Sequence, residues 1–465
     1  MHKFTKRGAR IAALLSVTAC ASVGPDYRRP EIALPPQFVG GGSLPAELNS
    51  TWWRGLGDPL LDQLITEGLL QNLPLQVAQA RVAQAQELLL QQGPLSRLSG
   101  EARLEREEIL RLDDGSRDST DRAQLGAAFV LDLFGRGQRA TEQARAQRDA
   151  QIYQEAAERL AFQAQLVATY LEARFQQASL RSLEQSLAGR QRILGLIREQ
   201  YALGMSTVLD VTRAEAEIDS ARATLPERRA AYQRAVFGIA TLLAEPASAL
   251  LGRMDRDPRQ PLPAADPDLG LPVQLVRNRP DVRRAEAELI AATAAIGVAT
   301  ADLYPSLSLG GTISARPGEA VVFGPLLTLP VFDRGVLASR RREAVLRARG
   351  AELVWRQAVL VAVEEVQRHY AAVAGWRQKA SALAKAEASL SRLLTLSNES
   401  FRAGETLALE LIDTQQDLNA TRLARIAALN DLAMSWSQLQ IAIGAGWQPM
   451  AIPEPDAAGR IVVAN

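Results

Sequence analysis

Two very long stretches of this 465-residue chain contain no proline, residues 95–225 and residues 331–448. Proline removes a backbone hydrogen-bond donor and clashes with the preceding turn, so its absence permits long uninterrupted helices. Residues 137–203 alone would form a rod of about 100 Å at 1.5 Å per residue, far longer than the usual helix of about 11 residues. A rod of this length needs neighbouring helices from its own chain or from other copies.

Two glycines divide these stretches into antiparallel helix pairs. On the first stretch apolar residues recur at the a/d spacing of packed helices, at Leu180, Leu183, Leu187, Leu194, Ile197 and Tyr201. The segments YALGMST and FRAGETL then place Gly204 and Gly404 shortly before Ser or Thr and a new apolar period. This order is typical of a helix C-cap followed by an N-cap. We expect returning helices to begin near Thr207 and Leu407, the first of them kinked at Pro226.

The same motifs recur with an offset near 200 residues, which indicates an internal duplication. YALG at 201–204 corresponds to FRAG at 401–404, and LDLFGRG at 131–137 corresponds to LPVFDRG at 329–335. Helices rich in Ala, Leu and Arg align easily by chance, but two motifs in the same order and register favour duplication. The domains we expect are residues 1–19, an extended segment 20–58, repeats 59–250 and 271–447, and a tail 448–465.

Short segments of alternating polarity lie between the helical stretches. Residues 124–133, 306–315 and 323–331 alternate in this way, whereas residues 98–112 fit less well because of their charges. Alternation with period two predicts strands with one apolar face, and about ten residues cross a membrane in a barrel. Four strands per chain cannot close a membrane barrel, but three copies would supply twelve. The predicted fold class is mainly α with a small β part.

The only cysteine, Cys20, follows a segment with the layout of a secretory signal. Four basic residues precede a short apolar core, Ile11 to Ala19, which is too short to span a bilayer as a helix. VTAC at 17–20 resembles the bacterial lipobox, where cleavage before the cysteine accompanies lipid attachment to its thiol and acylation of its amine. We expect a signal peptide at 1–19 and a lipid anchor at Cys20; the alternative is an ordinary signal peptide that contains a cysteine. By the enterobacterial sorting rule, Ala21 rather than Asp after the cysteine favours the outer membrane.

The composition argues against several classes of function. The formal charge is +1, and removal of residues 1–19 takes away four positive charges and leaves −3, whereas a nucleic-acid-binding protein would want a basic face. Of the two histidines only His369 would remain, which disfavours histidine catalysis and His-rich metal sites. No GxSxG, HExxH, phosphate-loop or dinucleotide motif occurs, and no segment after the signal supplies about 18 consecutive apolar residues. The sequence does not indicate an enzyme or a cofactor.

The chain resembles the TolC-type outer-membrane efflux channels, in particular the lipoprotein branch with OprM-like and NodT-like members. The resemblance covers nearly the whole chain after the signal and rests on these motifs: CASVGPDYRRP at 20–30, WWRGLGDPLLDQLI at 52–65, LDLFGRG at 131–137, RPDVRRAEAELIAATAAIGVATADLYPSLSL at 279–309 and IAIGAGW at 441–447. It implies a homotrimer with a twelve-stranded outer-membrane barrel and a long periplasmic α-helical barrel. It further implies a periplasmic adaptor and an inner-membrane pump as partners, and no cofactor.

In that family, acidic residues after the second glycine turn narrow the periplasmic mouth. Carried over, they are Glu410 and Asp413, with Leu409 one turn before Asp413, and spacings of three and four place all three on one helix face. Their alternative role is that of ordinary solvated acids at a helix start. The first repeat has Asp210 but Arg213 where the second has Asp413, so these two residues are a possible latch of the closed mouth.

Two other functions stay open at this point. One is a channel that secretes proteins or peptides, which the sequence does not separate from a channel for drugs or other toxic small molecules. The other is a non-conducting coiled-coil lipoprotein that acts as a periplasmic scaffold. A scaffold would have no membrane-crossing strands, so the alternating segments disfavour it.

Overall fold

The computed structural model describes residues 22–35, 38–39, 50–113, 115–256, 258–264, 278–314 and 321–447. Cys20 and the predicted segments 1–19 and 448–465 lie outside these residues. The chain divides into two compact units. Unit 1 comprises Met1–Ala33, Val77–Glu155 and Pro280–Leu360, and unit 2 comprises Leu34–Gln76, Ala156–Arg279 and Val361–Asn465.

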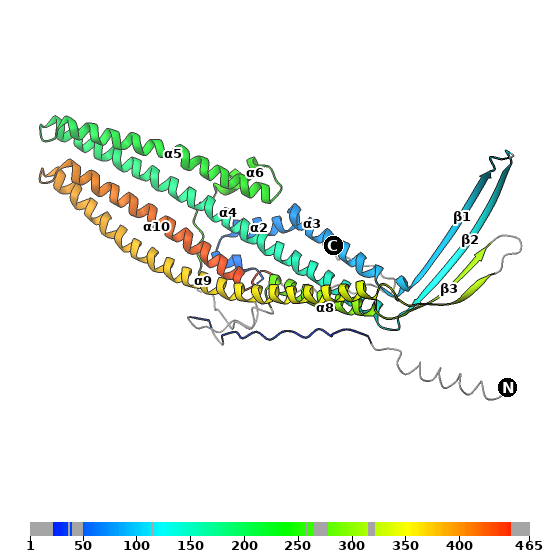
Figure 1. The fold of residues 1–465 in the computed structure, drawn as a ribbon. Helices are drawn as coiled ribbons and strands as arrows, with labels where there is room; N and C mark the ends of the chain where they lie inside the picture. Colours follow the sequence, from blue (N-terminus) through cyan, green and yellow to red (C-terminus); the bar gives the residue numbers. More distant parts are fainter. Residues whose placement is uncertain are drawn as a thin grey trace, which may run out of the picture. The chain divides into compact units, whose positions relative to one another are not determined.

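Two helices of great length dominate the described chain, as the proline-free stretches predict. Helix α4 runs over Arg136–Ala202, with 67 residues, and α9 over Arg334–Arg402, with 69 residues. Each is followed by a returning helix of 35 residues, α5 (Val208–Leu242) after α4 and α10 (Ala408–Ala442) after α9. Figure 1 shows each returning helix beside its long partner. Helix α5 continues through Pro226, and the kink there stays a prediction.

The two turns between long and returning helices have the same backbone geometry. Gly204 and Gly404 have φ of 76° and 77°, the left-handed region in which a side chain is strained. The amide of Met205 donates to the carbonyl of Gln200 at 2.9 Å, and the amide of Glu405 donates to that of Ser400 at 3.0 Å. These bonds satisfy carbonyls at each helix end, as in the Schellman motif. Both predicted helix ends are therefore confirmed.

A four-stranded antiparallel sheet in unit 1 has the order β1-β2-β3-β4. Its strands are β1 (Leu98–Leu110), β2 (Arg117–Leu131), β3 (Ser306–Ser314) and β4 (Val322–Thr328). Two predicted boundaries are wrong. Strand β2 begins at Arg117 rather than near 124, because it pairs with β1 along its length up to Leu110↔Arg117. Strand β4 ends at Thr328 rather than 331, since Thr328 already pairs with Ser306, the first residue of β3.

The register separates an apolar face of the sheet from a mostly polar or small one. The apolar face carries Leu98, Leu104, Leu125, Phe129, Leu309, Ile313, Phe323 and Leu327. The other carries Ser99, Glu101, Arg103, Gln124, Ser308 and Thr312. The apolar band ends beyond Leu104, where Arg106 lies opposite Asp121 and 3.8 Å from its carboxylate. The charges that obscured β1 in the sequence thus lie on the polar face or toward the hairpin tip.

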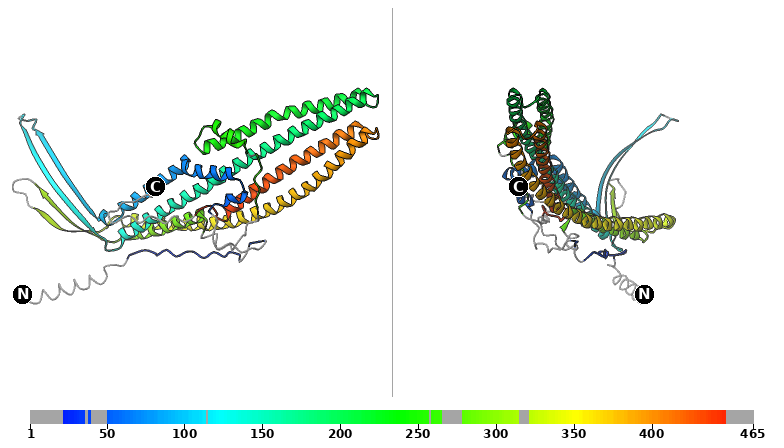
Figure 2. Two further views of the ribbon diagram at one scale, coloured as in Figure 1. Left: turned by 180° about the vertical axis from the view of Figure 1, so that it is seen from behind. Right: turned by 90° about the vertical axis from the view of Figure 1, so that its left-hand side faces the viewer.

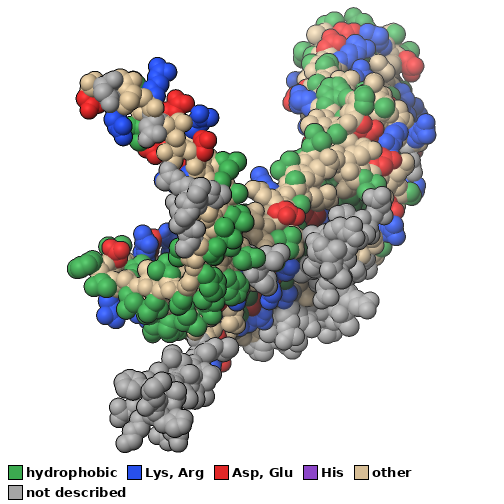
Figure 3. Space-filling view, turned by 90° about the vertical axis from the view of Figure 1, so that its right-hand side faces the viewer, with side chains coloured by type: hydrophobic (Ala, Val, Ile, Leu, Met, Phe, Trp, Pro, Cys, Tyr) green, Lys and Arg blue, Asp and Glu red, His purple; other side chains and the backbone are tan. Residues whose placement is uncertain are grey.

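The figures illustrate the same division. Figure 2 shows the long β1–β2 hairpin bending along its length. In Figure 3 hydrophobic side chains gather over the strands toward their base, and charged side chains gather at the hairpin tip. An apolar band limited in height, with charges beyond it, is typical of a strand surface that faces lipid.

The remaining elements complete each unit. Unit 1 contains α8 (Pro280–Ala301), η2 (Pro94–Arg97) and most of α3 (Leu73–Gln91), and unit 2 contains η1 (Trp52–Leu56), α2 (Pro59–Gln71) and α6 (Ala247–Met254). Trp52 and Trp53 are buried in the core of unit 2, where they act as packing residues. No single helix in the described ranges is long and apolar enough to cross a membrane; only α5 and α6 together, with a 120° bend between them, reach that length and apolarity.

Candidate functional site

The two helix turns of unit 2 share one apolar cluster, which holds the predicted gate residues in place. Its buried members come from α4, α5, α9 and α10 and are Ile193, Leu194, Ile197, Ala214, Ile218, Phe401, Ala408, Leu411 and Ile412. On α10, Leu411 and Ile412 point into this cluster, while Leu409, Glu410 and Asp413 are exposed. The structure therefore places all three predicted gate residues on the uncovered side of the helix start.

The first turn is closed by a capping box between Thr207 and Asp210. The Asp210 carboxylate accepts from the Thr207 amide at 2.9 Å and from its hydroxyl at 2.7 Å, and the Asp210 amide donates to that hydroxyl at 3.3 Å. The hydrogen bonds from the Thr207 side chain and backbone hold the pKa of Asp210 below its usual value. The Asp210 carboxylate is thus engaged in its own helix N-terminus.

The second turn lacks this cap. Leu407 occupies the N-cap position, and its side chain makes no capping hydrogen bond. The turn is braced instead by side chains before the helix, since Thr406 Oγ1 donates to Ser400 Oγ at 2.6 Å, which donates to Glu405 at 3.2 Å. Within the described part of one chain, the carboxylates of Glu410 and Asp413 have no hydrogen-bond or ion-pair partner. They are free to face a neighbour or a passing ion.

Arg213, the other half of the predicted latch, is exposed on α5. Its positive charge acts on Asp210, which lies on the same helix. Over the residues described, Arg213 forms no ion pair with Glu410 or Asp413 of its own chain. A latch through Arg213 would have to form between chains, and it stays a prediction.

Ion pairs that the sequence analysis did not find stiffen both hairpins. Arg190 pairs with Glu217, and Arg198 with Glu215 at 2.6 Å, between α4 and α5. Between α9 and α10, Glu387 accepts from Arg422 at 3.1 Å and from Arg425 at 2.9 Å. Burial opposes ionisation of Glu387, but the two guanidinium groups hold its pKa below the usual value. The sequence shows opposite charges on the helices of each hairpin, but which charges pair depends on how the two helices lie against each other.

The N-terminal segment that follows Cys20 is fastened to unit 1. Arg29 donates to both carboxylate oxygens of Glu286, at 2.7 and 2.6 Å, and Tyr27 donates to the same carboxylate at 3.0 Å. Arg139 binds Asp26 at 2.7 Å. Burial and the carboxylate of Glu286 raise the pKa of Tyr27. Asp26, Tyr27 and Arg29 of the motif GPDYRRP thus anchor this segment to α4 and α8.

Among the described residues, no group of three or more His, Cys, Asp or Glu side chains is arranged to hold a metal ion. Two exposed acids at a bare helix start can attract cations or hydrogen-bond donors.

Known proteins share this architecture. A family model described as "Outer membrane efflux protein" matches residues 64–245 and 271–445. Nodulation protein T of Rhizobium leguminosarum bv. trifolii is 32% identical over 465 residues, 97% of this chain and 99% of that protein. The pyoverdine export outer membrane protein OpmQ of Pseudomonas aeruginosa is 28% identical and matches 94% of this chain and 96% of its own. The solved structure of the outer-membrane channel OprN superposes with a TM-score of 0.83 at 28% identity, over 92% of this chain and 100% of that one.

Proposed function

The chain belongs to the outer membrane efflux protein family, and on this premise we propose that it is the outer-membrane exit duct of a tripartite efflux system. As an outer-membrane efflux channel it is not an enzyme. In our proposal a periplasmic adaptor and an inner-membrane pump deliver the substrate, and the channel conducts it passively. The energy comes from the pump.

We propose a homotrimer with a twelve-stranded barrel, and the sheet is the observation that carries this proposal. Strands β1 and β4 each pair on one side only within the described chain, so both edges are open. Open edges next to an apolar face are not stable in lipid unless other strands satisfy them. Four strands from each of three copies make twelve, which leaves room for a channel. The same apolar face disfavours a soluble periplasmic scaffold.

Long helices with uncovered apolar residues support the assembly. In unit 1, the α9 residues Leu346 and Leu353 are largely exposed and lie seven residues apart, followed at the same spacing by Leu360. A heptad seam of this kind is normally covered by another helix. We propose that helices of neighbouring copies cover it and that the helix pairs form an α-helical barrel in the periplasm.

We propose small molecules as the transported class, because OpmQ carries pyoverdine export in its name. The anchoring of the channel would combine the barrel with lipid on Cys20 after cleavage of residues 1–19. Substitution of Cys20 by Ser should abolish incorporation of labelled lipid. Lipid incorporation that persists in this variant would remove the anchor from the proposal.

The gate is proposed at Leu409, Glu410 and Asp413, where a trimer would gather six carboxylates. Replacement of both acids by Ala should raise the single-channel conductance in planar bilayers. A contact between unit charges is worth about 1 kcal/mol at 4 Å even in water, so block by trivalent cations should weaken at least about fivefold. Glu399→Ala, which removes an exposed carboxylate from the last turn of α9, is the matched control.

Two measurements decide the proposal. The mass of the detergent-solubilised complex should correspond to three chains, and the purified complex should conduct ions. A stable monomer that forms pores would contradict the strand argument, and a trimer without current would contradict the channel. Unchanged current and unchanged cation block in the double variant would mean that Glu410 and Asp413 are ordinary solvated acids at a helix start.

A further inference from the structure

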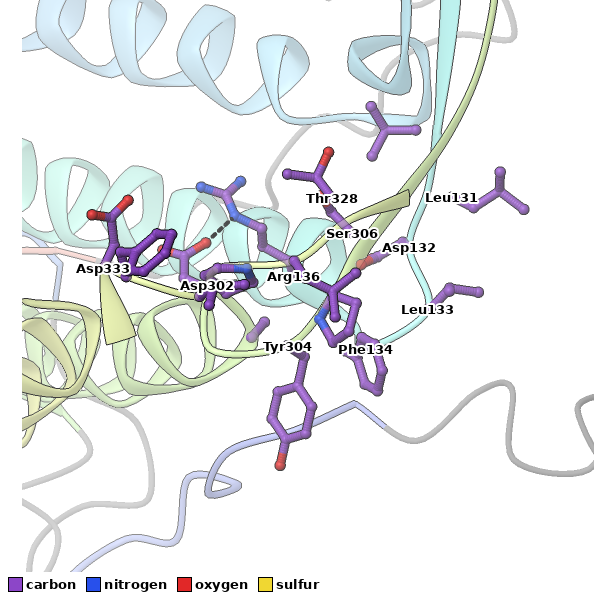
Figure 4. Close-up of a pocket in the computed structure, with 17 residues that line it drawn as sticks. Leu131, Asp132, Leu133, Phe134, Arg136, Asp302, Tyr304, Ser306, Thr328 and Asp333 are labelled. Carbon is purple, nitrogen blue, oxygen red and sulfur yellow. Dashed lines mark hydrogen bonds and ion pairs between the residues drawn. The ribbon is translucent and has the colours of Figure 1, made fainter. Parts of the chain in front are cut away.

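A cavity of about 650 Å³ lies at the base of the sheet in unit 1, where β2 leads into α4 and β4 leads toward α9 (Figure 4). Its walls are mixed: they include the apolar side chains of Leu131, Leu133, Phe134, Leu329 and Phe332 together with Tyr304, and also the charged side chains of Asp132, Arg136, Asp302 and Asp333. Phe134 and Tyr304 stack with their ring centres 4.6 Å apart. One ion pair, Arg136–Asp302 at 2.7 Å, lies among these groups. Both repeat motifs, LDLFGRG and LPVFDRG, contribute to the walls.

Within the described residues of one chain, part of this cavity stays uncovered. Phe332 is 98% exposed and Val331 66% exposed, although both line it. Neighbouring apolar side chains left this open mark a binding site for another apolar group. The volume is within the range of about 300–1,000 Å³ that is usual for small-molecule sites.

The N-terminal segment is fixed at the rim of this cavity. The amide of Val23 donates to the carbonyl of Phe134 at 3.1 Å, and Arg139 Nε donates to the carbonyl of Val23 at 3.2 Å. Gly135 has φ of 74°, and a Cβ there would lie 2.7 Å from the Cα of Ser22. Ser22 therefore packs directly against the turn that forms one wall. The ion pairs of Asp26 with Arg139 and of Arg29 with Glu286 hold the following residues in place.

The lipid proposed on Cys20 would be attached close to Ser22 along the chain. Cys20 is two residues before Ser22, and two extended residues span at most about 7 Å. In addition, the hydroxyl oxygen of Ser22 is buried and has no hydrogen-bond partner among the residues that the structure describes. A buried hydroxyl normally finds one, and an ester or amide carbonyl of an acylated Cys20 would begin within its reach.

We propose that this cavity binds an acyl chain carried by Cys20, so that the lipid anchor is also a packed part of the fold. The inference rests on the lipidation proposed above. Burial of each CH₂ against the apolar part of these walls contributes about 0.8 kcal/mol relative to exposure to water. A short tether also supplies the chain at an effective concentration in the millimolar range or above. The bound chain would cover Phe332 and bridge the two repeat motifs.

Photocrosslinking tests the site directly on the full-length protein. Cells are fed a fatty acid that bears a diazirine and a terminal alkyne, the purified protein is irradiated, and crosslinked peptides are mapped by mass spectrometry. We expect intrachain crosslinks to residues 131–134, 304 or 329–332. Crosslinks confined to bilayer lipid, to another copy of the chain or to the apolar sheet face would overturn the proposal.

Two phenylalanine variants provide a matched pair. Phe332→Ser removes a wall of the cavity, whereas Phe323→Ser removes an equally large side chain, 75% exposed, from the apolar face of β4. We expect at least a fivefold lower crosslink yield in the cavity for the first variant and an unchanged yield for the second. Equal yields in both would contradict the site even if wild-type crosslinks map there.

The outcome for this site is separable from the outcome for the channel. Single-channel current is recorded on the same preparations. A conducting protein whose label never reaches the cavity refutes the acyl site and leaves the channel in place. Wild-type protein that incorporates no label refutes the lipidation and with it this inference.

Discussion

Replacement of Leu407 by Thr should build in the second repeat the cap that the first repeat already has. The backbone is prepared for it, because Leu407 has φ −80° and ψ 150°, and Thr207 has φ −104° and ψ 162°. With Thr at 407 and Glu410 three residues later, the sequence becomes that of a capping box. The Thr207–Asp210 contacts of 2.7 to 3.3 Å show the geometry that the new pair can reach.

The expected gain is about 1 kcal/mol, the usual worth of a threonine N-cap relative to an apolar residue. Little is lost in exchange, because Leu407 is 76% exposed. A gain of this size should slow hydrogen exchange of the Glu410 amide about fivefold, as long as exchange reports local opening of the helix start. Thr207→Ala is the reciprocal control and should speed exchange at Asp210 by a similar factor.

The same change should affect conduction, since the new cap draws the Glu410 carboxylate toward the amide of residue 407. If Glu410 belongs to the mouth of the channel, block by trivalent cations weakens while Asp413 still contributes. Slower hydrogen exchange of the Glu410 amide together with unchanged cation block would contradict a role of Glu410 in the gate. Unchanged exchange at Glu410, beside a clear effect of Thr207→Ala, would refute the capping argument itself.

Three further outcomes are expected. Ala at Gly204 or Gly404 should each cost about 1–2 kcal/mol from the left-handed backbone. The two costs should be similar, because a Cβ at 204 meets open space and a Cβ at 404 meets only the terminal methyl of the flexible, exposed Met205 side chain at 2.7 Å; clearly unequal shifts in melting temperature would contradict this. Glu286→Arg should cost roughly 1–3 kcal/mol and expose the N-terminal segment to limited proteolysis. Adding Arg29→Glu should restore part of the protection against proteolysis. No recovery in the double variant would mean that the ion pair does not hold this segment. The pKa of Asp210 is lowered in the folded protein. Its capping box should therefore stabilise α5 above about pH 4, the pKa of an unfolded aspartate, and this stabilisation should be lost as the pH falls through the folded-state pKa. Hydrogen-exchange protection at the start of α5 that rises on acidification would contradict this direction.

The helical part of the fold was predictable because its signals are local. Proline can stop a helix and glycine can end one without reference to the rest of the chain, so α4 was placed to within one residue at each end. The strands were harder. The charges of β1 made sense only once its register against β2 placed Arg106 and Asp121 beyond the apolar band.

Contacts between distant residues were beyond any local signal. Arg29 and Glu286 are 257 positions apart, and nothing in either segment names the other as its partner. The different states of Asp210 and Glu410, by contrast, have a local signal. Thr207 lies three residues before Asp210, as in a capping box, whereas Leu407 lies three residues before Glu410. The sequence analysis identified both acids but did not use this difference, and the structure shows the engaged acid and the free one.

This difference between the repeats gives the two helix turns different charges. In the first, Asp210 is satisfied by its own cap, which leaves the positive charge of Arg213 exposed. In the second, Glu410 and Asp413 are both unpaired within the described chain. In the proposed trimer, turns in which the charges of Asp210 and Arg213 cancel would alternate around the mouth with turns that carry the two negative charges of Glu410 and Asp413. Since Arg213 forms no ion pair with either acid of its own chain, we expect any attraction between Arg213 and these acids to act between chains of the proposed trimer.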